Sequence, residues 1–178
     1  KSSLWHKIRG VYQTLTDKET PAKDAYVDYH LVRRKYILSQ SCAHFELDKH
    51  EPAPLLGKQL LDIGCGTNRI AEEIAFRGAD CTAVDMNDAA THLSQRSAQT
   101  KGSQVEFLLS SAEELVREGR TYDVILCLDV LEYAEDMKRL IWAIDKLLEE
   151  DGIVIFSSIN RTPKAWFFSV LMAEKVLK

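Results

Sequence analysis

The sequence predicts an α/β fold in which a doubly wound parallel sheet lies between two layers of helices. Three observations support this prediction. From about residue 57 onward, short apolar runs alternate with segments of helical periodicity, which is the pattern of repeated strand–helix units. The runs are apolar throughout, as expected of strands buried on both faces of a parallel sheet. The first run leads into a glycine turn and a helix, the opening unit of a dinucleotide-type α/β fold.

The glycine turn lies in the stretch 59–68, whose sequence is QLLDIGCGTN. Its apolar first half predicts a buried strand, and residues 69–75 have the periodicity of a helix. Gly64 and Gly66 stand between the two. Glycine suits this place because a side chain would keep the backbone away from a ligand. A glycine pair alone is weak evidence, so the prediction of a ligand site depends on its surroundings.

The next strand supplies that context. Residues 81–84 predict a strand that ends on Asp85. In nucleoside-binding α/β folds, an acidic residue at this place accepts hydrogen bonds from the ribose hydroxyls. An NAD-binding turn would have a third glycine where this chain has Arg69. An acid two positions before the first glycine, here Asp62, is instead typical of S-adenosylmethionine enzymes.

The motif therefore resembles the D-x-G-x-G-x-G pattern of class I S-adenosylmethionine-dependent methyltransferases. Asp62, Gly64 and Gly66 match it, whereas Asn68 stands where the last glycine is usual. Asparagine tolerates left-handed backbone better than most residues, so the turn is expected to keep its shape. The resemblance implies a Rossmann-like methyltransferase sheet that binds S-adenosyl-L-methionine, with Asp85 on the ribose.

Two helices are expected before the core. Apolar residues recur at helical spacing in 4–12, and 24–39 shows the same periodicity. A proline-containing linker follows. Residues 1–56 are therefore expected to form an N-terminal helical lid segment, and 57–161 the cofactor-binding core. Arg33 lies in a basic cluster. Either the cluster forms a solvated helix face, or it supplies a cation that reaches the carboxylate of the cofactor.

The core elements follow in regular order. Further strands are expected at 105–109, 122–128 and 152–156, and further helices at about 88–101 and 137–148. Ser111 and Glu114 form a capping box at the start of another helix. Ligands of such sheets bind outside the carboxyl ends of the strands, so the five loops at that edge form the candidate site.

The end of the sequence departs from the complete pattern. A class I methyltransferase sheet has seven strands, whereas five are evident here before residues 162–178. The last two strands are therefore expected to be missing, which would leave the fifth strand with an exposed edge. Residues 162–178 predict an apolar helix near the acceptor site, which either joins the core or touches lipid or a prenyl tail.

Composition excludes several classes of protein. With 46% hydrophobic and 28% charged residues the chain has an ordinary globular composition, and its net charge of −4 argues against a nucleic-acid partner. No run of about 18 apolar residues is present that would span a membrane. The four cysteines contain no C-x-x-C pair and are expected to be reduced, buried thiols. The expected location is cytoplasmic, and the apolar segment 162–178 leaves peripheral contact with the inner membrane open.

Two further segments make the resemblance more specific. Residues 128–133 (LDVLEY) lie where ubiquinone-biosynthesis O-methyltransferases have an acid-x-x-Glu-His motif, and residues 157–161 (SSINR) are similar to that family's Ser-Thr-Leu-Asn-Arg segment. The resemblance implies methyl transfer to a phenolic hydroxyl of a polyprenylated catechol, a quinone precursor. It also implies cofactor contacts at Arg33, Gly64, Asp85 and Leu128.

The remaining candidate residues are assigned by their place in these motifs. The cofactor set adds Asp62, Gly66, Ser111 and Ala112; the acceptor set is Asp129, Asn160 and Arg161; the catalytic candidates are Glu132 and Tyr133. Tyr133 replaces the family's histidine, and Asp129 replaces its preceding glutamate. A phenol is a poor nucleophile until a base or a cation helps to ionise it. Because a divalent cation has fewer ligands without the imidazole, no metal site is assigned, and any metal dependence is expected to be weak.

Two other functions stay open. One is a non-catalytic module that binds the nucleoside cofactor or a partner, which the altered Asn68 and Tyr133 and the missing strands favour. The other is an NAD-dependent oxidoreductase, which Arg69 disfavours.

Overall fold

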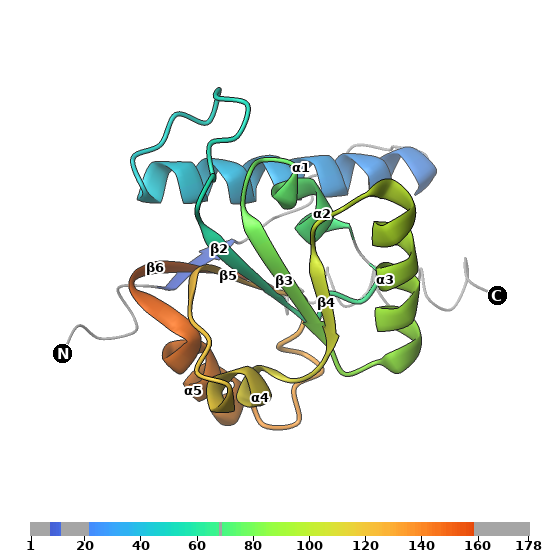
Figure 1. The fold of residues 1–178 in the computed structure, drawn as a ribbon, viewed down its shortest axis with the longest axis vertical. Helices are drawn as coiled ribbons and strands as arrows, with labels where there is room; N and C mark the ends of the chain where they lie inside the picture. Colours follow the sequence, from blue (N-terminus) through green and yellow to red (C-terminus); the bar gives the residue numbers. More distant parts are fainter. Residues whose placement is uncertain (1–7, 12–21, 68, 159–178) are drawn as a thin grey trace, which may run out of the picture.

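The computed structural model describes residues 8–11, 22–67 and 69–158 of the chain. The strands are β1 (Ile8–Val11), β2 (Gln59–Ile63), β3 (Asp80–Asp85), β4 (Glu106–Leu109), β5 (Tyr122–Leu128) and β6 (Leu148–Ser157), and the helices are α1 (Ala22–His44), α2 (Ile70–Ala75), α3 (Asp88–Lys101), α4 (Ala112–Arg117) and α5 (Met137–Leu147). The strands form one parallel sheet in the order β1-β6-β5-β2-β3-β4. This confirms the predicted α/β fold (Figure 1).

The side of the sheet to which successive strands are added changes beside β2. Strands β3 and β4 lie on one side of it, and β5, β6 and β1 on the other. Leu60 of β2 is thereby paired with both Cys81 and Val124. Ligands of such sheets bind at the carboxyl ends of the strands next to this reversal. The glycine turn that follows β2 lies at this point.

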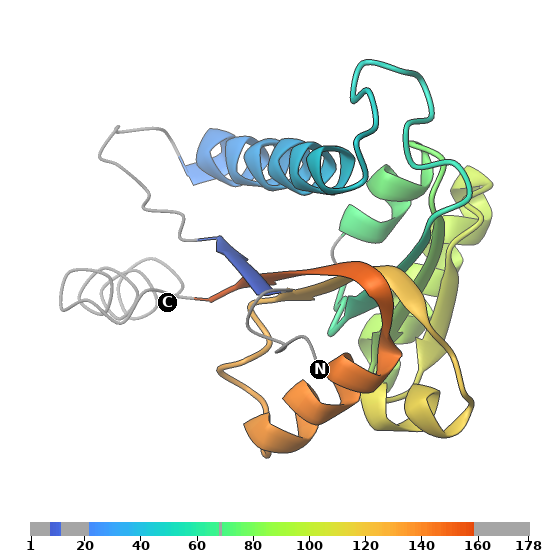
Figure 2. The same ribbon diagram turned by 90° about the vertical axis from the view of Figure 1, so that its left-hand side faces the viewer.

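Each face of the sheet has its own hydrophobic core. On one face Leu60 packs in a cluster with Ile37 and Cys42 of α1, together with residues of α2 and α3. On the other face, Leu61 belongs to a cluster with residues of α4 and α5. Figure 2 shows α1 and α2 above the sheet and α4 and α5 below it. Helix α1 therefore shares the main core, while the proposed boundary at residue 56 stays a prediction.

The prediction of a helix at 4–12 is wrong for residues 8–11, which form β1. This strand pairs in parallel with β6, from Ile8 opposite Val154 to Val11 opposite Ser157. The edge of β6 presents unpaired backbone groups, and pairing with them decides the structure of a short segment whose spacing alone is ambiguous. The edge that was expected to be exposed is thus covered by the chain itself.

Local signals placed most helix ends correctly. The Asn87 side chain accepts a hydrogen bond from the Ala90 N–H at 3.1 Å and caps α3. Gly102 closes that helix with a φ of 67°. The predicted capping box of Ser111 and Glu114 is present at the start of α4. Other ends shift by a few residues, since α1 is longer than 24–39 and α5 passes directly into β6.

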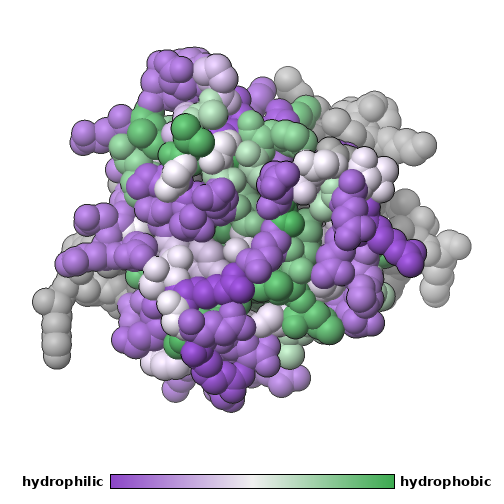
Figure 3. Space-filling view, in the orientation of Figure 1, coloured by the Kyte–Doolittle hydropathy of each residue, from purple (hydrophilic) through white to green (hydrophobic). Residues whose placement is uncertain are grey.

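The surface of the described residues mixes polar and apolar side chains. Figure 3 shows apolar areas broken up by polar ones on one face. No helix in the described part of the chain is long and apolar enough to cross a membrane. The predicted helix at 162–178 lies outside the described residues, so its contact with lipid stays a prediction. All four cysteines are buried and unpaired, as predicted.

Candidate functional site

The turn after β2 forms the centre of the candidate site. Gly64 and Gly66 both have left-handed backbone, with φ values of 68° and 53°. The N–H groups of Gly64 and Cys65 donate to the Val84 carbonyl at 2.8 and 3.1 Å, which ties the turn to β3. A Cβ on Gly64 would lie 2.4 Å from Cγ2 of Val130, whereas a Cβ on Gly66 would meet no atom within 4 Å. The first glycine is required by packing inside the protein, and the second faces open space.

Asp85 holds this turn in place. One of its carboxylate oxygens accepts a hydrogen bond from the Gly66 N–H at 2.7 Å, and the other accepts one from the Asn87 N–H, also at 2.7 Å. Ser94 of α3 donates to the Gly66 carbonyl at 3.0 Å. Because each carboxylate oxygen has a second acceptor position, Asp85 can still accept hydrogen bonds from a pair of ligand hydroxyls.

Asp62 is a buried carboxyl without a partner. It is 1% exposed, and neither of its oxygens has a hydrogen-bond partner in the described structure. Burial raises its pKa to about 7; the charge of Arg33 lowers the pKa and that of Asp85 raises it. A buried carboxylate without a partner is costly, so this group favours a ligand that brings a positive charge.

Asp62→Asn is expected to remove part of the pH dependence of folding stability. Between the ordinary pKa of 3.8 and the folded value of about 7, the folded state holds a proton that the unfolded state has lost. The free energy of unfolding should therefore fall as the pH rises from about 4 to about 7, by at most about 1.4 kcal/mol per pH unit from this group. Denaturant unfolding of both proteins across this range measures the effect. Identical pH profiles would contradict it.

Helix α1 brings Arg33 to the same edge of the sheet. Arg33 is 8% exposed, so it does not lie on a solvated helix face, whereas Lys35 does. Its guanidinium forms an ion pair with Asp129 and donates to the Ser157 hydroxyl at 3.1 Å. That hydroxyl donates to Asp129 at 2.7 Å. The Asp129 N–H donates to the Ser157 carbonyl at 2.9 Å. We call Arg33, Asp129 and Ser157 the clamp.

The clamp joins two sets of residues that the sequence assigned to different ligands. Arg33 was expected on the cofactor, and Asp129 on the acceptor. The structure pairs them, although 96 residues separate them in sequence. The role of Ser157, 124 residues from Arg33, was missed. No local pattern signals such a contact, because a serine at the end of a strand is common whether or not it binds an arginine.

Three of the predicted cofactor residues are partly or wholly committed to the protein's own structure. The Ser111 hydroxyl accepts from the Glu114 N–H at 3.3 Å as the cap of α4. Ala112 and Leu128 are 2% and 5% exposed and belong to the two cores. Their contact with the cofactor remains a prediction, and Ala112 and Leu128 could make polar contacts only through their backbone.

The catalytic candidates lie in the turn after β5. Glu132 is exposed, and Tyr133 is 81% exposed, with its N–H donating to the Val130 carbonyl at 2.9 Å. Asn160 and Arg161 lie outside the described residues. Among the residues that the structure describes, no three His, Cys, Asp or Glu side chains lie together as a metal site would require.

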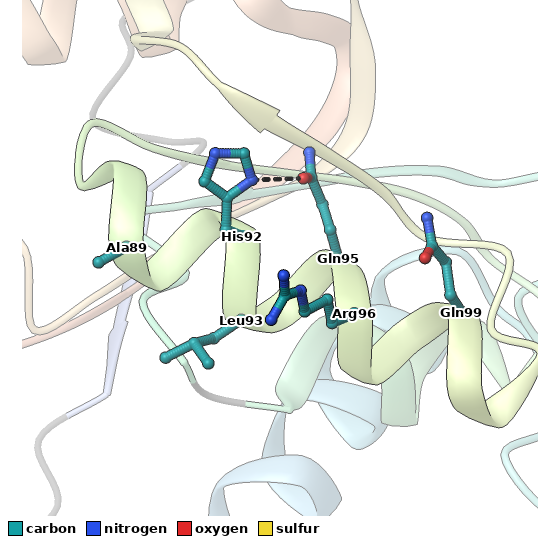
Figure 4. Close-up of a pocket in the computed structure, with 6 residues that line it drawn as sticks. All are labelled: Ala89, His92, Leu93, Gln95, Arg96 and Gln99. Atoms are coloured by element: carbon teal, nitrogen blue, oxygen red, sulfur yellow. Dashed lines mark hydrogen bonds between the residues drawn. The ribbon is translucent and has the colours of Figure 1, made fainter.

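A separate pocket lies along α3. Its six lining residues all come from this helix, and none of them is a predicted site residue (Figure 4). His92 and Gln95 interact with one another there, with Nδ1 and Oε1 3.3 Å apart. The pocket is therefore distinct from the edge that carries the glycine turn.

Known proteins resemble this chain in sequence. Residues 61–156 match the family described as "Methyltransferase domain". The chain is 33% identical over 150 residues to a ubiquinone biosynthesis O-methyltransferase from Rhizobium etli, covering 84% of this chain and 60% of that protein. It is 40% identical over 129 residues to a ubiquinone biosynthesis O-methyltransferase from Saccharophagus degradans, covering 72% and 55%. The chain thus spans little more than half the length of these relatives.

A solved structure agrees in fold. Magnesium protoporphyrin IX methyltransferase from Synechocystis, with bound S-adenosylmethionine, matches with a TM-score of 0.56 and 23% identity over 75% of this chain and 62% of that one. The resemblance that the sequence motifs indicated is confirmed by these matches. Since the family match covers more than half of the chain and includes β2 to β6 nearly in full, the chain belongs to the methyltransferase domain family.

Proposed function

We propose that this chain is the cofactor-binding part of an S-adenosylmethionine-dependent O-methyltransferase that acts on a phenolic hydroxyl of a polyprenylated, catechol-type quinone precursor. The geometry of Asp85 carries the proposal. Its two oxygens are oriented by the N–H groups of Gly66 and Asn87 at the point where a nucleoside ribose binds in such sheets. The relatives named as ubiquinone biosynthesis O-methyltransferases support the class of acceptor.

The residues of the site fit the proposed cofactor. Asp62 offers a buried negative charge for an ammonium group, Arg33 a positive charge for a carboxylate, and Gly66 an open approach to the backbone. The cofactor, when bound, supplies a methyl group on a positively charged sulfur. Transfer to a phenolic oxygen also requires the phenol to lose its proton, for which Glu132 is the proposed base.

Calorimetric titration of the chain with S-adenosylhomocysteine and, separately, with NADH tests the proposal. We expect S-adenosylhomocysteine to bind and NADH not to bind, because the glycine turn has Arg69 in place of the third glycine of a dinucleotide site. Binding of NADH alone would replace the proposal with an oxidoreductase.

A non-catalytic cofactor-binding module is the second candidate. The exposed Tyr133 favours it, because a phenol is a poor base at neutral pH and supplies no imidazole. A methyl-transfer assay on a small catechol, with and without magnesium, separates the two functions. Turnover supports the enzyme, while tight binding of S-adenosylhomocysteine without turnover supports the module.

A further inference from the structure

The clamp holds a buried arginine, Arg33, near the glycine turn by pairing it with a carboxylate. We propose that Asp129 occupies the place of a ligand carboxylate on Arg33, and that the amino-acid end of the cofactor binds by displacing Asp129. This inference rests on the proposed function, and it adds how the cofactor enters and what its entry does to the acceptor side.

The clamp lies next to the turn that would carry the cofactor. Val130, which follows Asp129, is so close to Gly64 that a Cβ on the glycine would approach its Cγ2 to 2.4 Å. On the other side, the charge of Arg33 lowers the pKa of Asp62, the acid of the glycine motif. Arg33 is therefore close to two acids, Asp62, which suits a ligand ammonium, and Asp129, at the end of β5.

Burial explains why Arg33 needs a carboxylate at all times. Its side chain is 9% exposed. A buried guanidinium without a counter-charge is strongly unfavourable, so the site without ligand must supply one. Asp129 supplies the negative charge, and the Ser157 hydroxyl adds a hydrogen-bond acceptor. A ligand carboxylate that replaced Asp129 would leave Arg33 with an anionic partner both before and after binding. The exchange therefore avoids the cost of a buried guanidinium without a counter-charge.

Asp129 is suited to leave. Its side chain is 36% exposed, so its carboxylate can move into water without crossing the core. Its φ of 56° is left-handed, which non-glycine residues adopt rarely and at some cost. The clamp stabilises that backbone shape. Once released, the carboxylate lies at the mouth of the site, where it can face an acceptor. Cofactor binding is therefore expected to precede binding of the acceptor.

The test compares two ligands that differ only in the amino-acid end. S-adenosylhomocysteine has the carboxylate, and 5′-methylthioadenosine lacks it. In Asp129→Asn the competing charge is lost, so S-adenosylhomocysteine should bind about fivefold more tightly, the effect of one partly exposed ion pair. Ser157→Ala, which keeps the charge of Asp129 and loses the two hydrogen bonds that the Ser157 hydroxyl makes in the clamp, should tighten it by about twofold. The affinity for 5′-methylthioadenosine should not change in either variant.

Asp145→Asn is the matched control, because Asp145 is exposed on α5, is not part of the clamp, and forms an ion pair with its neighbour Lys146. It should leave both affinities unchanged. Unchanged or weaker binding of S-adenosylhomocysteine to Asp129→Asn would overturn the displacement, and so would equal tightening of 5′-methylthioadenosine. If Asp129→Asn does not fold, as judged by thermal unfolding, Ser157→Ala decides alone. If the natural chain binds neither ligand, the proposed function itself fails.

Discussion

Asp85→Ala is expected to weaken binding of S-adenosylhomocysteine by about 100-fold or more. Two charge-assisted hydrogen bonds to the ribose would be lost, each contributing roughly 1.5–3 kcal/mol. The structure adds a second reason, because Asp85 also accepts the N–H groups of Gly66 and Asn87 and so fixes the turn itself. Calorimetric titration of the natural chain and the variant measures the loss.

Asp88→Ala is the control for this experiment. Asp88 lies only three residues further along, in the first turn of α3, and it is exposed. The Asp88→Ala substitution removes the same charge from the same region without changing a residue that holds the glycine turn. An affinity of Asp85→Ala equal to that of the natural chain would remove the basis for the ribose site. Circular dichroism of each variant shows whether the fold is kept.

Gly64→Ala is expected to lower the free energy of unfolding by about 2–5 kcal/mol. A left-handed backbone costs an alanine about 1–2 kcal/mol, and overpacking adds about 1–3 kcal/mol. The overpacking arises because the new Cβ would lie 2.4 Å from Cγ2 of Val130. Denaturant unfolding measures the change.

Two further variants separate these contributions. Gly66→Ala introduces only the cost of a left-handed backbone, because no atom lies within 4 Å of the position of its Cβ. Its free energy of unfolding should therefore fall by only about 1–2 kcal/mol. Combining Gly64→Ala with Val130→Ala should recover stability relative to the sum of the two single changes. Simple additivity of the two single changes would show that Val130 does not oppose the methyl group.

The parts of the fold that the sequence predicts well are those with local causes. Strands β2 and β5 are buried on both faces, so most of their residues are apolar and the sequence marks them clearly as strands. The capping box of Ser111 and Glu114 needs only residues three apart, and the left-handed Gly102 needs only the end of its own helix. The places of Asp62 in β2 and of Asp85 at the end of β3, beside the glycine turn, could likewise be predicted, because the same motif fixes them relative to the strands; their binding of a nucleoside stays a prediction.

The parts of the fold that the sequence does not predict depend on contacts between residues that are far apart in the chain. Residues 8–11 become a strand because the edge of β6 accepts them, and the two segments lie at opposite ends of the described chain. Arg33 could be assigned to the site, but its pairing with Asp129 depends on how α1 crosses the sheet. The role of Ser157 depends on both. A single sequence holds no signal for these contacts, since each residue is of a common type at its own place.

The position of β1 at the edge of the sheet, and of α1 on one face of it, affects the order in which the protein folds during synthesis. Both elements emerge from the ribosome before the rest of the described chain, whereas their partners in β6 and the clamp come at the end of the described residues. Strands β2, β3 and β4 are consecutive in sequence and neighbours in the sheet, so they can pair early. Closing the far edge instead waits for contacts of very long sequence separation, which slow folding. Until then, the apolar side of α1 and the edge of β6 lack part of their native cover, and such exposed surfaces favour aggregation of the nascent protein.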